Sequence, residues 1–297
     1  MRLIDMGQRT SELVGVHSAY RIRAHYQQVV HGVRAPSGPE VTTLDKIRAV
    51  ALLYPDAVFC GWTAAGLHGV PYSAGHPVEI QLPYHRRRSG IIVRRSAMPD
   101  GDVATVDGFR VTTPVRTAID LARYVKGDEA VAAVDQCLRV GEFGVAQVTA
   151  RDVAEYLAEH RHLHRCTRVA QVLAQVDGRA ESPWETYARL FLRRSGLTMF
   201  VPQTPVTGTA MRLDLGAEEF KVAVEYEGEY HADRAQHRRD VARWNRLRFD
   251  HGWEIVLAAA PSLHAQRAAF LRQVQTALAS RGWTPQDPRA RNAAQLP

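Results

Sequence analysis

The sequence predicts a mixed α/β protein, α+β overall, with two parts, and three observations support this prediction. Segments with apolar residues three and four positions apart, typical of amphipathic helices, alternate with short segments rich in Val and Ile, typical of strands. The length of 297 residues corresponds to about two domains. The pattern also changes at Ser182, where a capped helix begins a new series of elements.

Residues 1–40 have the pattern of a small winged helix-turn-helix. Thr10 or Ser11 can cap a first helix, a second short amphipathic segment follows, and VVHGVRAP is compatible with a β-wing. A helical extension without a recognition role fits the same spacing equally well. Both interpretations stay open at this point.

Residues 41–145 alternate helices with strands. VTTLDKIRAVALLYP predicts a helix, PVEIQLP, SGIIVRRSA and GFRVTTP predict strands, and VRTAIDLARYV and DEAVAAVDQCLRVG return to the helical period. Residues 146–180 are polar and helical and are predicted to connect the two parts. Their histidines, His160, His162 and His164, are spaced by two and do not share a helix face, so we interpret them as solvated rather than as metal ligands.

Residues 181–284 predict a second α/β unit in the order helix, three strands, helix, strand, helix. SPWETYARLFLRRSGL is a helix in which Ser182 is the N-cap, Pro183 lies in the first turn, Glu185 is the capping-box acid and Gly196 ends the helix. Residues 285–297 are predicted to be a disordered tail.

The composition is that of a globular protein rather than a membrane protein or a disulfide scaffold. The chain has no run of about 18 apolar residues and no secretory signal at its start, so we expect no membrane partner. Three scattered cysteines without a CxxC pair indicate the reducing cytoplasm. A formal net charge of +7 suits a polyanionic partner such as nucleic acid.

Three acidic residues can meet on one face of the second unit. In KVAVEYEGEYH, Glu225 and Glu227 point the same way because side chains alternate along a strand. If the preceding hairpin is closed by an even number of residues, Asp214 joins Glu225 on that face. Mg²⁺, or Mn²⁺ as an alternative, would relieve the repulsion among them and could activate water beside a phosphodiester. The alternative is that these acids coat the solvent face of a sheet.

Residues 181–265 resemble the PD-(D/E)XK nuclease superfamily, and more narrowly proteins related to the very-short-patch-repair endonuclease. The resemblance rests on SPWETYARLFLRRSGL, RLDLG, VAVEYEGEYH and RRDVARWNRLRFDHGWEIV. It implies a restriction-endonuclease-like core in which Asp214 and Glu225 bind the metal and Glu227 replaces the usual Lys, as a further ligand. It also implies that His231 is a general acid or base and that Glu185 supports or reaches the metal.

The first part is similar to the AbiEi family of antitoxins and transcriptional regulators. The similarity rests on the helix from Thr63 to Gly69 and on TTPVRTAIDL, with Thr113, Arg116 and Asp120. It implies a winged helix-turn-helix that precedes this module and binds operator DNA. Within the module, Arg116 and Asp120 are expected to form an i,i+4 ion pair.

Two groups of arginines are candidates for contact with nucleic acid. Arginines can pair with phosphates and reach base edges, and five of them fall on a predicted hairpin while two lie four apart on a helix. They are Arg86, Arg87, Arg88, Arg94 and Arg95 on the hairpin, and Arg239 and Arg243 on the helix. A solvated turn and a salt-bridged helix face are the respective alternatives.

These patterns give two functional hypotheses. The first is a cytoplasmic, Mg²⁺-dependent endonuclease whose first part targets DNA, with RNA as an open alternative. The second is an AbiEi-type antitoxin or transcriptional regulator whose nuclease-like part does not cut, because the usual Lys is missing. A toxin or defence-system protein and a second copy of the chain are the expected protein partners.

Overall fold

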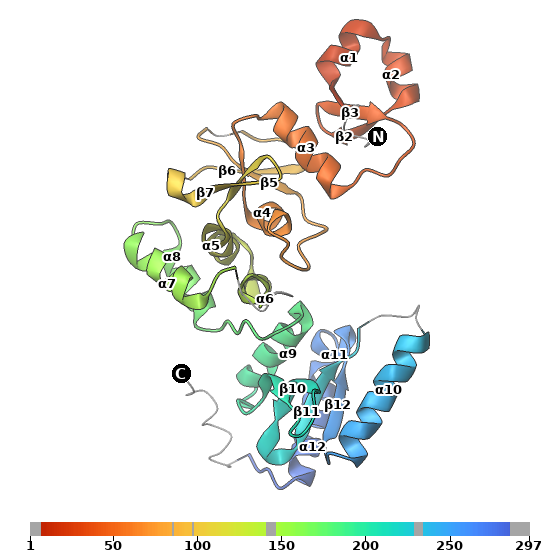
Figure 1. Cartoon of the computed structure of the whole chain (residues 1–297), viewed down its shortest axis with the longest axis vertical. Coiled ribbons are helices and arrows are strands. Elements are labelled where there is room, and N and C mark those ends of the chain that lie inside the picture. Colours follow the sequence, from red (N-terminus) through yellow and green to blue (C-terminus); the bar gives the residue numbers. More distant parts are fainter. Residues whose placement is uncertain (1–6, 85, 97, 141–146, 229–233, 286–297) are drawn as a thin grey trace. The chain divides into compact units, whose positions relative to one another are not determined.

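A computed structural model describes residues 7–84, 86–96, 98–140, 147–228 and 234–285 (Figure 1). Contacts divide the chain into two compact units. Unit 1 is Met1–Tyr124 with Gln147–Val169, and unit 2 is Val125–Ala146 with Ala170–Pro297. The described residues form helices and three β-sheets, which confirms the predicted α/β class.

Unit 1 begins with the helix, turn, helix and hairpin predicted for its first residues. The elements are β1 (Gln8–Arg9), α1 (Thr10–Val16), α2 (Ala19–His25), β2 (Tyr26–Val30) and β3 (Val33–Pro36), with the strands in the order β1-β3-β2. Ser18 caps α2 by accepting a hydrogen bond from the amide of Arg21 at 3.3 Å. The cap predicted for α1 is wrong, because Arg9 holds the N-cap position and Thr10 is already helical.

The rest of unit 1 is a five-stranded mixed sheet with helices, in the strand order β6-β5-β4-β8-β7. Val30 and Val33 of the hairpin share one hydrophobic core with Ile47, Ile80 and Val111, so the winged part and the sheet are packed together. The elements are α3 (Thr43–Leu53), β4 (Val58–Phe59), α4 (Gly61–Leu67), β5 (Val78–Gln81), β6 (Ile91–Arg94), β7 (Val103–Val106), β8 (Phe109–Thr112), α5 (Pro114–Tyr124), α7 (Ala150–Glu159) and the start of α8 (Cys166–Leu173).

Unit 2 has the predicted order of helix, three strands, helix, strand, helix, preceded by α6. In its sheet, β9, β10 and β11 are antiparallel, β12 is parallel to β11, and the order is β12-β11-β10-β9. The elements are α6 (Gly127–Leu138), α9 (Pro183–Arg194), β9 (Val201–Pro205), β10 (Arg212–Ala217), β11 (Val222–Tyr226), α10 (Arg234–Phe249), β12 (Glu254–Ala258), α11 (Ala260–Leu263) and α12 (Arg267–Ser280).

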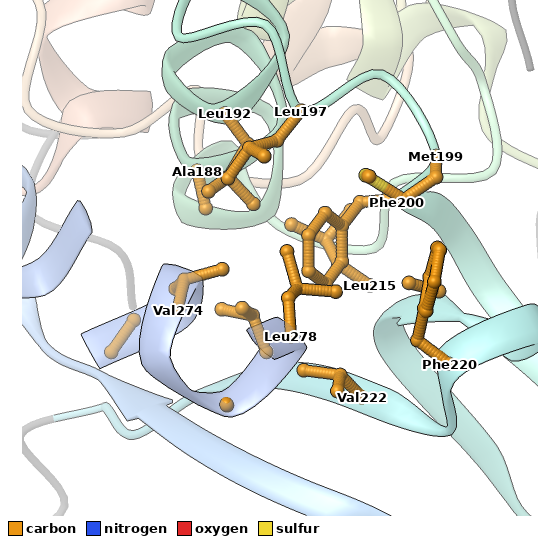
Figure 2. Packing of buried hydrophobic residues seen from close by; sticks show 14 of the residues in the cluster. Ala188, Leu192, Leu197, Met199, Phe200, Leu215, Phe220, Val222, Val274 and Leu278 are labelled. Carbon is orange, nitrogen blue, oxygen red and sulfur yellow. The ribbon is translucent and has the colours of Figure 1, made fainter. Parts of the chain in front are cut away.

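Helices cover both faces of the unit 2 sheet. On one face, Leu192 of α9 and Leu278 of α12 pack against Leu215 of β10 (Figure 2). On the other face, Leu247 of α10 packs against Ala223 of β11. A parallel pair such as β11 and β12 needs a crossover connection, and α10 provides it. Charged groups on the α10 face are therefore held between a sheet and a helix.

Among the helices in the described ranges, none is both long and apolar enough to cross a membrane.

Candidate functional site

The first candidate site is formed by carboxylates on two neighbouring strands of unit 2. Leu215 pairs with Val224, and one further step of this antiparallel register places Asp214 opposite Glu225. The amide of Tyr226 donates to Oδ2 of Asp214 at 2.8 Å, and the amide of Asp214 donates to Oε1 of Glu225 at 3.1 Å. The structure thus brings together the two residues predicted to bind a metal.

Glu185 reaches the same region from the first turn of α9. Ser182 accepts a hydrogen bond from the Glu185 amide at 3.2 Å, as predicted for an N-cap. The Glu185 carboxylate does not return to the N-cap amide; its Oε2 accepts from the amide of Glu181 at 2.9 Å and from Nε2 of Gln203 at 3.0 Å. Burial of the side chain, followed by the nearby negative charge of Asp214, raises the pKa of Glu185 to about 7.

Gln203 belongs to this cluster although the sequence analysis did not select it. The register that pairs Thr204 with Leu213 and Pro202 with Leu215 places Gln203 opposite Asp214. Its φ of 52° lies in the left-handed region, which side chains other than Gly rarely adopt. Such strained positions are concentrated at functional sites. The only signal in the sequence is one amide side chain within the strand VPQTP.

Arg243 of α10 supplies the positive charge of the cluster. Its Nη1 donates to Oε2 of Glu225 at 2.5 Å and its Nη2 lies 3.4 Å from Oε1. Nη2 also donates to the backbone carbonyl of Arg212 at 2.5 Å. The phosphate contact predicted for Arg243 is therefore not what this geometry provides, because its guanidinium is committed to a buried carboxylate and a strand carbonyl.

The cluster holds more negative than positive charge. Burial, followed by the charge of Glu225, raises the pKa of Asp214 to about 7. Burial also raises the pKa of Glu225, while Arg243 opposes that rise. The cluster contains three carboxylates and one guanidinium, so protons or another cation must offset the remaining charge near neutral pH.

In this arrangement the carboxylates offer few free oxygens to a divalent ion. Both oxygens of Glu225 and one oxygen each of Asp214 and Glu185 already accept hydrogen bonds. Within the described ranges, no three His, Cys, Asp or Glu side chains form a metal-binding group. Glu227 follows β11 and is exposed to solvent, and His231 lies outside the described residues. As folded, the donor set does not fit the Mg²⁺ ion that the nuclease resemblance implies.

The second candidate site is the exposed face of α2 in unit 1. Ile22 is buried against the hairpin, whereas Tyr20, Arg21 and Arg23 are exposed. Tyr20 has 77% of its surface accessible, which is high for an aromatic residue. These residues are not among those predicted from the sequence. The signal for them was Ser18, an N-cap residue directly before the alternating pattern AYRIRAH.

The structure divides the arginines predicted to bind nucleic acid into two groups. Arg88 donates to Tyr54 at 2.8 Å and to the carbonyl of His31 at 3.1 Å, and Arg94 pairs with the buried Glu79. For these two the phosphate contact is not what the geometry provides, because their guanidiniums join elements of unit 1. The other four have exposed side chains and keep that role as a prediction: Arg86, Arg87, Arg95 and Arg239.

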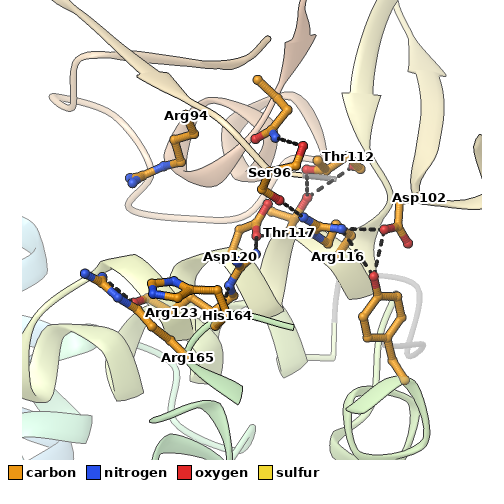
Figure 3. A network of polar contacts seen from close by, with 12 residues as sticks. Arg94, Ser96, Asp102, Thr112, Arg116, Thr117, Asp120, Arg123, His164 and Arg165 are labelled. Carbon is orange, nitrogen blue, oxygen red and sulfur yellow. Dashed lines mark hydrogen bonds and ion pairs between the residues drawn. The ribbon is translucent and has the colours of Figure 1, made fainter. Parts of the chain in front are cut away.

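A buried ionic network holds the centre of unit 1 (Figure 3). Arg116 donates to Asp120 at 3.2 Å, which confirms the predicted ion pair, and to Asp102 at 2.5 Å. Arg123 donates to the same oxygen of Asp120 at 2.8 Å. Tyr156 of α7 donates to Asp102 at 2.7 Å, so residues far apart in the sequence are tied to α5.

Comparison with known proteins assigns to a class a segment that includes the five-stranded sheet of unit 1 and also α6 of unit 2. Residues 57–175 match the AbiEi antitoxin C-terminal domain, a segment that contains the whole of the Arg116 network. The chain therefore contains an AbiEi antitoxin C-terminal domain, as the resemblance of the first part implied. The matched segment ends before the carboxylate cluster begins.

A comparison that covers about three quarters of the chain places it in a family. It is 30% identical over 234 residues to the uncharacterized proteins MT2308, from Mycobacterium tuberculosis strain CDC 1551 / Oshkosh, and Rv2248, from strain ATCC 25618 / H37Rv. Each alignment covers 77% of this chain and 83% of the relative. The chain belongs to the same family as these two mycobacterial proteins.

Proposed function

We propose that this protein is a DNA-binding regulator of the AbiEi antitoxin type, in which unit 2 is a nuclease-like scaffold that does not cut. The observation that carries the proposal is the exposed face of α2, the second helix of a helix-turn-helix. In winged-helix proteins this helix enters the major groove, where arginine recognises guanine and phosphate. Tyr20 lies on the exposed half of the helix, and Arg21 and Arg23, which are two positions apart, flank it on the two sides of the buried Ile22.

The match of residues 57–175 to the AbiEi antitoxin C-terminal domain supports the antitoxin part of the proposal. A toxin protein is then the expected partner of unit 1. The net charge of +7 supports binding to a polyanion, because Lys and Arg that neutralise phosphates release counterions.

The experiment is a fluorescence anisotropy titration of random-sequence duplex DNA at several salt concentrations. The double variant Arg21→Ala/Arg23→Ala is compared with Arg151→Ala, which removes another exposed arginine of unit 1, from α7. We expect the double variant to bind about 10-fold or more weakly and to lower the salt slope by about two, while Arg151→Ala binds like the wild type. Equal binding by the double variant and the wild type would refute the assignment of α2.

A second candidate is the Mg²⁺-dependent endonuclease, which one observation favours: Glu185, Asp214 and Glu225 converge from α9, β10 and β11. Plasmid and single-stranded DNA, incubated with Mg²⁺, Mn²⁺ or EDTA, distinguish the candidates. Under the main proposal the wild type binds and leaves the DNA intact with every metal. Cleavage that is lost in Asp214→Ala would favour the endonuclease.

A further inference from the structure

Arg243 occupies the centre of the carboxylate cluster. Its guanidinium contacts both oxygens of Glu225 and the carbonyl of Arg212, and its charge also lowers the pKa of Asp214 against the rise that burial causes. These are oxygen ligands of the kind that hold Mg²⁺ in proteins. An arginine therefore stands where the acidic residues would otherwise need a metal ion.

The packing of α10 fixes this position. Leu247, one turn after Arg243 and on the same helix face, is fully buried against the sheet. The amide of Trp253 donates to the carbonyl of Leu247 at 2.9 Å, and the Trp253 ring is buried beside it. Because the end of α10 is anchored in this way, the position of the helix directs the Arg243 side chain toward Glu225.

We propose that Arg243 replaces a metal ion in this cluster, so that the wild-type protein binds no divalent cation there, and that a neutral side chain at position 243 converts the cluster into a divalent-cation site. The inference rests on the proposed function, since it explains why the nuclease-like unit would not cut. It does not depend on α2 or on DNA.

The proposal follows from charge and donor count. Without the guanidinium, three carboxylates from Glu185, Asp214 and Glu225 would face one another in a buried space, where like charges strongly disfavour the ionised state. Removal of Arg243 would also free Oε2 of Glu225 and the carbonyl oxygen of Arg212 from the guanidinium, and it would leave Oε1 of Glu225 with the Asp214 amide as its donor. A hard dication with a few carboxylates and several waters would then offset the charge.

The experiment is a titration of the full chain with Mn²⁺ at pH 8, followed by electron paramagnetic resonance of the free ion and by calorimetry. The variants are Arg243→Ala, Arg243→Gln and Arg243→Ala/Asp214→Asn. Arg246→Ala is the matched control, because it removes an exposed arginine from the same helix. Arg243→Lys retains the charge without the planar fork.

The wild type, Arg246→Ala and Arg243→Lys are expected to show no Mn²⁺ site that depends on Asp214. Arg243→Ala and Arg243→Gln are expected to bind one Mn²⁺ about 10-fold or more tightly than the wild type, and the double variant to lose that site. Circular dichroism verifies the fold of each variant, and the glutamine variant serves if the alanine variant does not fold.

Two outcomes overturn the proposal. One is a wild-type Mn²⁺ site that Asp214→Asn abolishes. The other is a folded Arg243→Ala or Arg243→Gln protein without any gain in Mn²⁺ affinity. Neither outcome alters the DNA titration of the α2 variants, so a failure of this inference and a failure of the proposed DNA-binding function are seen separately.

Discussion

The two units each bury a group of charged side chains, and the groups differ in their balance. In unit 1, two arginines, Arg116 and Arg123, face two carboxylates, Asp102 and Asp120, and every one of them has an oppositely charged partner. In unit 2, the single guanidinium of Arg243 pairs with Glu225 and lowers the pKa of Asp214, and Glu185 has no oppositely charged partner among the groups that shift its pKa. Buried charges are tolerated when they are paired and hydrogen-bonded. The first group meets this condition, whereas the second retains a net negative charge that no side chain of the cluster neutralises.

This difference identifies which of the two groups is a candidate for binding. A balanced network carries little net charge that could attract an ion, because its charged groups are already paired. An unbalanced one shifts pKa values toward neutrality and attracts protons or cations, which is typical of functional sites. The carboxylate cluster has this property, and Arg243 is the residue that limits it.

The largest expected effect comes from breaking the balanced network. Asp120→Ala leaves Arg116 and Arg123 buried without the oxygen they share, so we expect the free energy of unfolding to fall by about 3–5 kcal/mol. Urea denaturation followed by circular dichroism measures this. Asp100→Ala, an exposed aspartate of the same unit, is the control. A loss for Asp120→Ala no greater than that of the control would mean that the network does not stabilise unit 1.

A smaller effect is expected from pH on unit 2. The folded-state pKa of Glu185 and Asp214 is about 7, above the ordinary carboxyl value, so the folded state binds more protons than the unfolded state between about pH 4 and pH 7. The free energy of unfolding should therefore fall as pH rises through this window and level off above it.

Asp214→Asn sharpens this test, because the amide oxygen can still accept from Tyr226 while the charge is gone. We expect the variant to lose much of the pH slope and to be more stable than the wild type at pH 8. Asp135, whose pKa burial raises to about 6, contributes equally to both proteins, so their difference isolates the cluster. Parallel pH profiles for the two proteins would argue against an unbalanced cluster.

The smallest effect is expected at Glu227. Its side chain is exposed, so Glu227→Gln should change the free energy of unfolding by less than about 0.5 kcal/mol. Combined with Arg243→Ala, the same change tests whether Glu227 is a metal ligand, as the sequence analysis predicted. If Glu227→Gln leaves the Mn²⁺ affinity unchanged, the protein ligands are limited to the buried carboxylates. If it lowers the Mn²⁺ affinity, Glu227 is a ligand as well.

Local periodicity made part of the site predictable. The alternation of side chains along a strand correctly anticipated that Asp214 and Glu225 can share a face, and the N-cap at Ser182 placed Glu185 at the start of its helix. The i,i+4 spacing likewise predicted the pair of Arg116 and Asp120. Each of these inferences uses residues within one element or one hairpin, where geometry follows directly from the sequence.

The rest depends on tertiary packing that no local pattern contains. Arg243 contacts Glu225 only because α10 forms the crossover connection and packs on the sheet. Tyr156 contacts Asp102 from α7, 54 residues later in the sequence. The same reason explains the partners of two arginines that were predicted to contact phosphates. Arg88 and Arg94 were expected on a free hairpin, yet Tyr54 and Glu79 from other elements hold them.

The most direct test of the account is a crystal of the wild-type protein soaked in Mn²⁺, with anomalous scattering recorded at the manganese edge. The account predicts no manganese between Asp214 and Glu225, and the Arg243 guanidinium in contact with both Glu225 oxygens. A manganese peak within coordination distance of those two carboxylates, with Arg243 displaced, would contradict it.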